Sequence, residues 1–357
     1  MKIAFALMVH RSDDERVAFQ EAASLRDCGD VVDIFSAADK EMNREEKMHW
    51  MKERLSSADY DVIICDTPIA VNVACQVRNR NKSTSIKTKV IYDITEWYPS
   101  KKNLRGHSFL QTIIRFISLS FLSLIAGCRT DGFIFGEYYK SFPFKYLFFW
   151  KPMSIISYYA PLNKIKKIPM KESLHNNCTF YYSGNLTSEK GFDRVVSVVQ
   201  QVAMKKPSTQ FVLKIVSSQV PSVNSIAPNL VMEHLNWMPF DAFCETLGEG
   251  DIFFDLRNND IENTHCLPIK LFYYMAAGRP MIYSDLKAIR KSIPEFNTIG
   301  CLVEPDNEEE IVNLLLSYID NPKIYRNQCQ NSLNLSLLKY NWEAIKNDFI
   351  NFIHHGV

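Results

Sequence analysis

The sequence predicts an α/β protein made of two Rossmann-like domains, each a doubly wound parallel sheet covered by helices on both faces. Short apolar runs of strand length alternate with segments whose apolar residues recur at helical spacing, and this alternation restarts midway along the chain. The chain has 357 residues, more than one hydrophobic core usually serves. We therefore expect two domains, at residues 1–162 and 163–338.

The first domain is expected to begin with a buried strand at residues 3–9. This apolar run ends in the charged sequence from His10 to Glu15, whereas a secretory signal ends in small residues at a cleavage site. Further strands are expected at 31–35, 61–65 and 89–92, with helices at 16–26, 45–57 and 69–80. Ligands of such sheets bind beyond the carboxyl ends of the strands, where His10, Asp66 and Glu96 fall.

Residues 109–127 form an apolar segment almost long enough to span a bilayer. Arg115 interrupts it, and a central arginine costs at least ~2.5 kcal/mol on insertion scales, so a membrane span is disfavoured. Two alternatives remain: a buried core helix, the commoner use of such a sequence, and a helix lying on a membrane surface. Residues 101–151 mix basic and aromatic side chains, which attract anionic headgroups; they include Lys101, Lys102, Arg105, Lys140, Lys145, Phe149, Trp150 and Lys151.

The second domain is expected to follow a linker at 161–177. Strands are expected at 179–182, 211–216, 230–234, 251–256 and 281–283, and helices at 192–203, 241–247, 267–277 and 308–319. Pro268 suits the first turn of the helix at 267–277, and Gly278 suits its end. Because this helix begins after the polar loop 257–264, its unsatisfied N–H groups are expected to hold an anion.

The composition excludes several function classes. Lys and Arg (41) nearly balance Asp and Glu (40), which argues against a nucleic-acid partner. The nine Cys include no C-x-x-C pair, so they read as small hydrophobic residues in a reducing, cytoplasmic compartment, with neither a zinc site nor a disulfide framework.

Three stretches of the second domain resemble the donor half of glycosyltransferase family 4. They are Ser183-Gly184-Asn185 through Lys190-Gly191, Asp251-Ile252-Phe253-Phe254, and Leu267-Pro268-Ile269-Lys270-Leu271-Phe272 leading to Met275-Ala276-Ala277-Gly278-Arg279-Pro280. In the first domain, Asp14-Glu15-Arg16-Val17 and Tyr92-Asp93-Ile94-Thr95-Glu96-Trp97-Tyr98 are similar to a subgroup that builds surface polysaccharides. The resemblance implies the GT-B fold, with two domains facing a cleft and a final helix at 339–357 that crosses back to the first domain.

The resemblance also implies retaining transfer of a sugar from a UDP- or GDP-sugar to a glycan or lipid-linked glycan acceptor. A departing nucleoside diphosphate develops negative charge, which cations and backbone N–H groups must stabilise. Lys190 matches the family's phosphate-binding lysine, and the backbone at Gly184 and Gly191 is expected to approach the same anion. The family usually has an arginine at Asn185, so Lys270 is the candidate for the second cation.

The usual pair of glutamates is replaced in this chain. His265 and Tyr273 fall at those positions, beside Leu267 and Pro268. Tyrosine can hydrogen-bond a ribose but carries no charge at neutral pH, and Glu262 is the nearest substitute carboxylate.

On the acceptor side, Glu96, Asp66 and His10 are the candidates for orienting or deprotonating a hydroxyl group. The resemblance implies front-face attack without a protein nucleophile, without a metal and without a cofactor other than the donor. It further implies polysaccharide biosynthesis at the cytoplasmic face of a membrane. Two alternatives stay open: a catalytically weak relative acting as a binding or scaffold subunit, and a nucleotide-sugar epimerase of the same fold.

Overall fold

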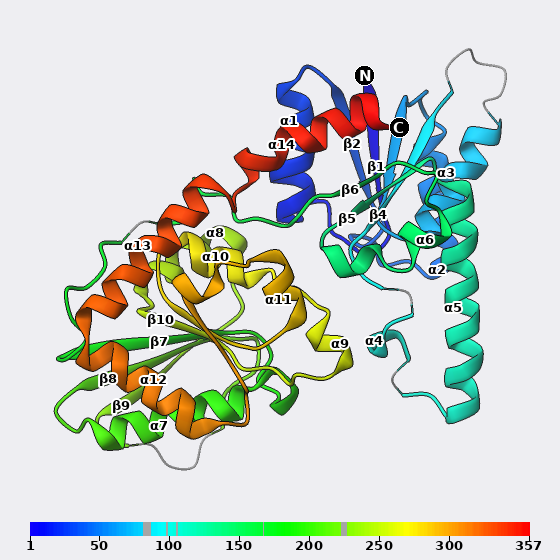
Figure 1. The fold of residues 1–357 in the computed structure, drawn as a ribbon. Helices are drawn as coiled ribbons and strands as arrows, with labels where there is room; N and C mark the ends of the chain where they lie inside the picture. The colour runs from blue at the N-terminus through cyan, green and yellow to red at the C-terminus, as the bar shows by residue number, and fades with distance from the viewer. Residues whose placement is uncertain (81–86, 98, 105, 167, 223–226) are drawn as a thin grey trace. The chain divides into compact units, whose positions relative to one another are not determined.

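The computed structural model describes residues 1–357 except 81–86, 98, 105, 167 and 223–226 (Figure 1). It contains two compact units. The first comprises Met1–Tyr158 together with Ile345–Val357, and the second comprises Tyr159–Ala344. The second unit is therefore inserted between two parts of the chain that fold together.

The first unit is built on a six-stranded parallel sheet with the order β2-β1-β3-β4-β5-β6. Its strands are β1 (Lys2–Leu7), β2 (Val31–Ser36), β3 (Val62–Cys65), β4 (Lys89–Ile94), β5 (Gly132–Phe135) and β6 (Met153–Ile155). Its helices are η1 (Val17–Glu21), α1 (Ala22–Asp27), α2 (Arg44–Leu55), α3 (Pro68–Arg80), α4 (Lys101–Leu104), α5 (Phe109–Arg129), η2 (Tyr138–Ser141) and α6 (Phe144–Leu147). The four predicted strands are confirmed, whereas β5 and β6 were not predicted.

Local sequence explains where the first helices begin and end. Gly29, with φ +88°, follows α1 and lets the chain turn into β2. Asn43 caps α2, since its side-chain oxygen accepts the N–H groups of Glu45 and Glu46. The helix predicted at 16–26 begins with the π-helical turn η1, a rare conformation that is frequent at functional sites.

The helix predicted at 109–127 is present as α5, but it is not a core helix. Only its later turns are buried, at Ser123, Ala126 and Gly127, where α5 packs against α3. Its N-terminal half projects beyond the sheet (Figure 1). By length and composition α5 could cross a bilayer, and it is the one helix with this property in the described part of the chain. The prediction of a buried helix was wrong because periodicity does not reveal whether a neighbouring element covers an apolar face.

The second unit is built on another six-stranded parallel sheet, with the order β12-β11-β10-β7-β8-β9. Its strands are β7 (Asn177–Ser183), β8 (Gln210–Val216), β9 (Leu230–Leu235), β10 (Ile252–Asp255), β11 (Met281–Ser284) and β12 (Gly300–Val303). Its helices are η3 (Ser188–Lys190), α7 (Phe192–Lys205), α8 (Phe240–Thr246), η4 (Leu247–Glu249), α9 (Ile261–Thr264), α10 (Lys270–Ala276), α11 (Lys287–Ser292), η5 (Phe296–Thr298), α12 (Glu308–Asp320) and α13 (Pro322–Leu338). The prediction of two doubly wound α/β domains is confirmed.

The strand β12 and the helix α11 were not predicted, and two predicted elements differ in detail. The helix expected at 267–277 begins only at Lys270, because Pro268 stands in a preceding turn whose carbonyl accepts the N–H of Leu271. The polar loop expected at 257–264 contains α9, which Asp260 caps through the N–H groups of Glu262 and Asn263.

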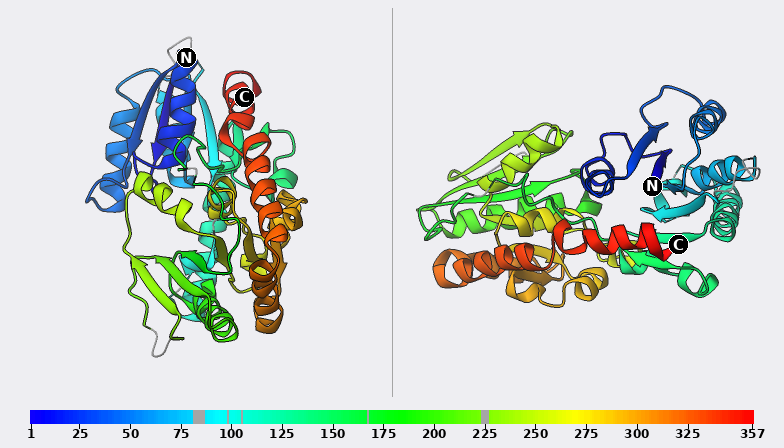
Figure 2. Two further views of the ribbon diagram at one scale, coloured as in Figure 1. Left: turned by 90° about the vertical axis from the view of Figure 1, so that its left-hand side faces the viewer. Right: turned by 90° about the horizontal axis from the view of Figure 1, so that it is seen from above.

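The C-terminal segment belongs to the first unit, where it completes the helical layer. It comprises α14 (Trp342–Asn351), which enters this unit at Ile345, and η6 (Phe352–Gly356). Asp30 accepts hydrogen bonds from the N-terminal amine of Met1 at 2.7 Å and from His354 Nε2 at 2.7 Å. The two chain ends therefore lie close together in all views (Figures 1 and 2).

The strand orders place a topological switch point in each sheet. In the first sheet β1 lies between β2 and β3, so the connections leave β1 and β3 in opposite directions. In the second sheet β7 and β10 form the equivalent pair. Ligands of open α/β sheets bind beyond the carboxyl ends of such strands, so the loops after β1, β3, β7 and β10 are where sites are expected.

Candidate functional site

In the second unit, the loops after β7 and β10 pack closely on each other. Gly191, with φ +74°, lies so near the second loop that a Cβ at this position would be 1.9 Å from the carbonyl oxygen of Leu256. The Asn258 N–H donates to the Glu189 carbonyl at 2.9 Å, and Arg194 bridges the carbonyls of Ser188 and Leu256. The conformation of the loop that carries Lys190 therefore depends on a glycine at position 191.

Three cations gather at this switch point. Lys190 ends η3, Arg257 follows β10, and Lys270 begins α10. Arg257 forms a two-pronged ion pair with the buried carboxylate of Asp255, with Nε at 2.7 Å from Oδ1. Lys190 Nζ also lies 3.6 Å from Glu189 Oε1, so two carboxylates among three cations leave the cluster with an excess of positive charge.

Lys270 is the most strongly perturbed member of this cluster. Its Nζ donates to the Ser183 carbonyl at the end of β7. The pKa of Lys270 is lowered to about 8, chiefly by burial and also by the charges of Arg257 and Lys190, while Asp255 opposes the change. Gly184 makes room for this amine, since a Cβ there would lie 2.7 Å from Nζ. A nearby anion would stabilise the charged form of Lys270.

The other residues predicted on the donor side are spread more widely. Asn185 is exposed, and its backbone carbonyl accepts the Tyr182 hydroxyl at 2.7 Å. Glu262 is exposed on α9, and the His265 ring contacts the Ile261 carbonyl of the same short helix at 2.8 Å. Tyr273 is buried, with its ring packed against Phe240 and Phe243 of α8. Leu267 and Pro268 are also buried, in the turn before α10.

In the first unit, Asp66 fixes the loop after β1. Its buried carboxylate accepts the backbone N–H groups of Met8 at 2.9 Å, Val9 at 3.0 Å and His10 at 3.2 Å. Burial raises the pKa of Asp66, although these three backbone groups counteract the shift. These contacts make Asp66 a residue that positions His10, and its predicted role toward an acceptor stays a prediction.

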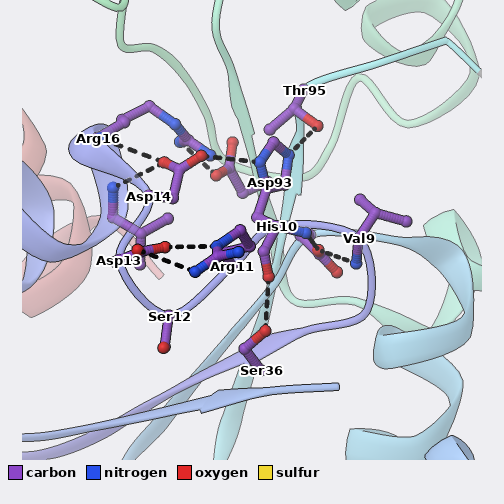
Figure 3. A network of polar contacts seen from close by, with 12 residues as sticks. Val9, His10, Arg11, Ser12, Asp13, Asp14, Arg16, Ser36, Asp93 and Thr95 are labelled. Atoms are coloured by element: carbon purple, nitrogen blue, oxygen red, sulfur yellow. Dashed lines mark hydrogen bonds and ion pairs between the residues drawn. The ribbon is translucent and has the colours of Figure 1, made fainter. Parts of the chain in front are cut away.

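His10 lies between a carboxylate and a hydroxyl group (Figure 3). Its Nδ1 is 3.0 Å from Asp14 Oδ2, and its Nε2 is 3.1 Å from Thr95 Oγ1, just after β4. Burial lowers the pKa of His10, but the hydrogen bond to Asp14 and the charges of Asp14 and Asp66 outweigh it, so the pKa is raised overall. A histidine held in this way can exchange protons at neutral pH.

A buried ionic cluster lies beside His10, and the sequence did not predict it. Arg16 Nη1 is 2.6 Å from Glu21 and 2.5 Å from Asp93, and its guanidinium carbon lies 4.4 Å from the centre of the Tyr158 ring. Burial raises the pKa of Glu21 to about 8, with Asp93 and Asp14 adding to the shift and Arg16 opposing it. One arginine does not compensate two buried carboxylates, so the cluster retains a proton.

Glu96 is more exposed than His10 and Asp66, the other two acceptor-side candidates. It is exposed on the loop after β4, one residue beyond Thr95. The structure thus brings His10 and Asp66 together and sets Glu96 on an adjacent loop.

Some of the candidate site residues that were not predicted stand at positions that a sequence pattern indicates. Arg257 follows a predicted strand directly, which is the position where ligand contacts are expected. Arg16 and Asp93 gave no such signal, because an ion pair across 77 residues leaves no local pattern. In the described residues, no three His, Cys, Asp or Glu side chains lie close enough to hold a metal ion.

Comparison with known proteins supports the resemblance. A family model described as "Glycosyl transferases group 1" matches residues 177–321, within the second unit. An uncharacterized glycosyltransferase of Haemophilus influenzae (strain ATCC 51907 / DSM 11121 / KW20 / Rd) is 30% identical over 172 residues, which are 46% of this chain and 44% of that protein. The aligned region thus spans less than half of this relative.

Solved structures resemble the whole chain. Sucrose-phosphate synthase from Thermosynechococcus elongatus has a TM-score of 0.70 at 15% identity and covers 99% of this chain and 98% of its own. WaaG, a glycosyltransferase involved in lipopolysaccharide biosynthesis, has a TM-score of 0.69 at 12% identity over 100% of both chains. Anabaena HepE in complex with UDP-glucose has a TM-score of 0.67 at 13% identity over 99% of both.

These similarities cover the fold of the whole chain and the sequence of its second unit. The chain therefore has the GT-B fold, and its residues 177–321 match the model of group 1 glycosyl transferases.

Proposed function

We propose that this chain is a glycosyltransferase that moves a sugar from a UDP- or GDP-sugar to a glycan or lipid-linked glycan acceptor, with retention of configuration. The main support is the cluster of Lys190, Lys270 and Arg257 at the switch point of the domain that matches group 1 glycosyltransferases. Three cations and two carboxylates, Asp255 and Glu189, leave a net positive charge that suits the diphosphate of a nucleotide sugar.

The charge of this cluster suggests how the leaving group is stabilised. As the sugar leaves, negative charge grows on the diphosphate, and a cation that is already in place lowers the energy of that state. Lys270 is held partly desolvated, so an arriving phosphate should raise its pKa and strengthen the attraction. In this proposal the cations act without a metal ion or a further cofactor.

The acceptor side of the proposal rests on His10. Asp66 holds the backbone of His10 and Asp14 holds its ring, and the raised pKa of the ring makes it suited to receive a proton from an acceptor hydroxyl or to hold that hydroxyl in position. Glu96, on the adjacent loop, is the candidate for a second contact. We place the protein at the cytoplasmic face of a membrane, in polysaccharide or glycoconjugate synthesis. The similarity in fold to WaaG, which is involved in lipopolysaccharide biosynthesis, supports the assignment to glycoconjugate synthesis.

Calorimetric titration of the full-length protein with UDP, GDP and ADP tests the proposal. We expect one uridine or guanosine nucleotide to bind, and Lys190→Ala to weaken it about 10- to 100-fold, since a hydrogen bond to a charged group is worth about 1.5–3 kcal/mol. Lys205→Ala, which removes an exposed lysine of α7, is the matched control and should leave the affinity unchanged.

Two results would contradict this assignment. Absence of binding to all three nucleotides would favour a scaffold role, and unchanged affinity in Lys190→Ala would remove the phosphate site. Consumption of the donor sugar without any acceptor would instead indicate an epimerase or a hydrolase.

A further inference from the structure

The N-terminal half of α5 exposes apolar side chains on all sides. Phe109 is 83% exposed and Phe121 is 61% exposed, and the residues between them are also mostly outside the core. The strongest contributors are Phe109, Leu110, Ile114, Phe116, Ile117 and Phe121. Soluble proteins rarely leave so many large apolar side chains together in water, so this half of α5 is expected to contact a partner.

A second apolar segment lies beside the C-terminal end of α5. The Phe148 ring packs on Gly127, where a Cβ would be only 2.5 Å from the ring, and Lys151 Nζ donates to the Gly127 and Cys128 carbonyls at 2.8 Å. Between these anchor residues, Phe149 is 78% exposed and Trp150 is 64% exposed. The second segment is thus fixed to the same helix, near its C-terminal end. We call the two exposed segments together the α5 face (residues 109–121 and 146–150).

The charges around the α5 face are almost all positive. Residues 101–151 contain eight Lys or Arg and two acidic residues. Both acids are neutralised, since Asp131 pairs with Arg78 at 2.6 Å and Glu137 pairs with Lys140 at 2.7 Å. Of the basic residues, Arg105 and the side chains of Lys101 and Lys102 lie outside the described part of the chain. A positive rim around exposed aromatic residues matches the surface of a bilayer with anionic headgroups.

The packing of α5 limits how deeply it can enter a bilayer. Its later turns are buried against α3, so only about the first ten residues are free of the protein core. At ~1.5 Å per residue these turns reach ~15 Å, about half of a ~30 Å hydrocarbon core. Arg115 is exposed among them, and its Nε donates to the Asn103 carbonyl at 3.0 Å. A helix that enters one leaflet fits these features better than a membrane span.

We propose that the α5 face docks this chain on an anionic lipid bilayer, with the first turns of α5 inserted into the near leaflet. The inference rests on the membrane location given under the proposed function and says which surface makes the contact, but it depends on no residue of the nucleotide or acceptor sites. A second copy of the chain is the other possible occupant of the face. Residues 109–121 and 146–150 contain no Asp or Glu, so the contact of this face with its own copy would leave Arg115 without a carboxylate from the facing segments, which favours the lipid surface.

Co-sedimentation of the full-length protein with vesicles tests this inference. We expect binding to phosphatidylcholine vesicles that contain phosphatidylglycerol, weaker binding without the anionic lipid, and release at high salt. The triple variant Phe109→Ser, Ile114→Ser and Ile117→Ser should bind the anionic vesicles at least ~10-fold more weakly, because interfacial binding scales with buried apolar area. A matched control replaces three equally exposed residues of the second unit, Val220→Ser, Trp237→Ser and Leu338→Ser.

Thermal melting and nucleotide titration of both triple variants keep the result interpretable. Unchanged melting temperature and nucleotide affinity would show that lost vesicle binding arises from the α5 face and that the proposed function stands apart from it. Wild-type protein that stays in the supernatant with both vesicle types would overturn the inference. So would a wild-type dimer that the α5 triple variant converts to a monomer, since a second copy would then cover the face.

Discussion

At the scale of single residues, Asp14 opposes the effect of burial on the protonation of His10. Burial alone would lower the pKa of His10, and the hydrogen bond to Asp14 at 3.0 Å, together with the charges of Asp14 and Asp66, reverses that shift. Asp14→Asn should therefore lower the pKa of His10, while the retained side-chain oxygen still accepts the N–H groups of Arg16 and Val17. Proton NMR titration of the ring measures the pKa, with His10→Gln identifying the resonance. An unchanged pKa would show that Asp14 does not control the ring.

The sign of the His10 effect on stability follows from the same shift. A histidine whose pKa is raised by folding stabilises the native state fully below its unfolded pKa, and this contribution is lost as the pH rises through the folded pKa. Asp14→Asn should reduce that stabilisation in acid and leave the alkaline stability of the first unit almost unchanged.

Glu21 makes the first unit sensitive to alkaline pH. Its folded pKa, about 8, lies above the unfolded value of ~4.3. Protonated Glu21 thus favours the folded state. This stabilisation is fully present below the unfolded pKa and is lost as the pH rises through the folded pKa. Glu21→Gln keeps the shape without the charge and should raise the melting temperature at alkaline pH by about 3 °C or more. In acid, melting curves of variant and wild type should coincide.

The exposed Glu41→Gln is the control for this measurement. It should leave the pH dependence of melting as it is in the wild type. If the melting temperature of Glu21→Gln fell as steeply at alkaline pH as that of the wild type, the titrating group would be another member of the Arg16 cluster.

The positions of site residues that follow a local sequence pattern could be predicted. Contacts between residues far apart in the sequence could not. Lys190 follows a glycine-containing loop after a strand, so its position at the edge of the sheet could be predicted from sequence. The contacts of Arg16 with Asp93 and of Lys270 with Ser183 join residues 77 and 87 positions apart. Only the fold brings such pairs together.

At the scale of elements, Gly191 holds the Lys190 loop against the loop after β10. Gly191→Ala should destabilise the second unit by more than about 3 kcal/mol, because a positive φ and a clash with the Leu256 carbonyl act together. Nucleotide affinity should fall with it, since the loop carries Lys190. Thermal melting and calorimetry measure the two effects.

Gly29→Ala separates backbone strain from steric overlap. Gly29 also has a positive φ, of +88°, but a Cβ there would meet no atom within 4 Å. The cost should be only about 1–2 kcal/mol. Similar losses in both variants would show that the contact between the two loops contributes little to stability.

Most elements of both sheets followed from hydrophobic patterning, and most failures have physical causes. β5 and β6, with four and three residues, were not predicted; β6 is too short for a period to be recognised, and nothing in the length of β5 distinguishes it from the four-residue strands that were predicted. The start of α10 was misplaced because a proline suits both a first helical turn and the turn before it. The exposure of α5 depends on which neighbours cover it, which is a property of the fold and not of the segment.

At the scale of the whole molecule, the C-terminal segment completes the core of the unit that begins the chain. Phe349 and Ile353 are buried there, and His354 joins Met1 at Asp30. The second unit has its own continuous core between β7–β10 and helices α7 and α12. Each unit should therefore have its own free energy of unfolding, although the first unit consists of two chain segments that flank the second.

Matched core mutations should separate the two stabilities. Phe349→Ala should destabilise the first unit by about 3–5 kcal/mol, the usual cost of removing a buried ring, and Phe211→Ala in β8 should do the same to the second unit. Hydrogen exchange measures each unit separately: amides of β1 and β2 should exchange faster in the first variant, and amides of β7 and β8 in the second. If Phe349→Ala accelerated exchange in both sheets equally, the units would unfold as one cooperative body. Separate responses would mean that the C-terminal segment stabilises the first unit specifically, because the second unit would keep its protection when that segment is weakened.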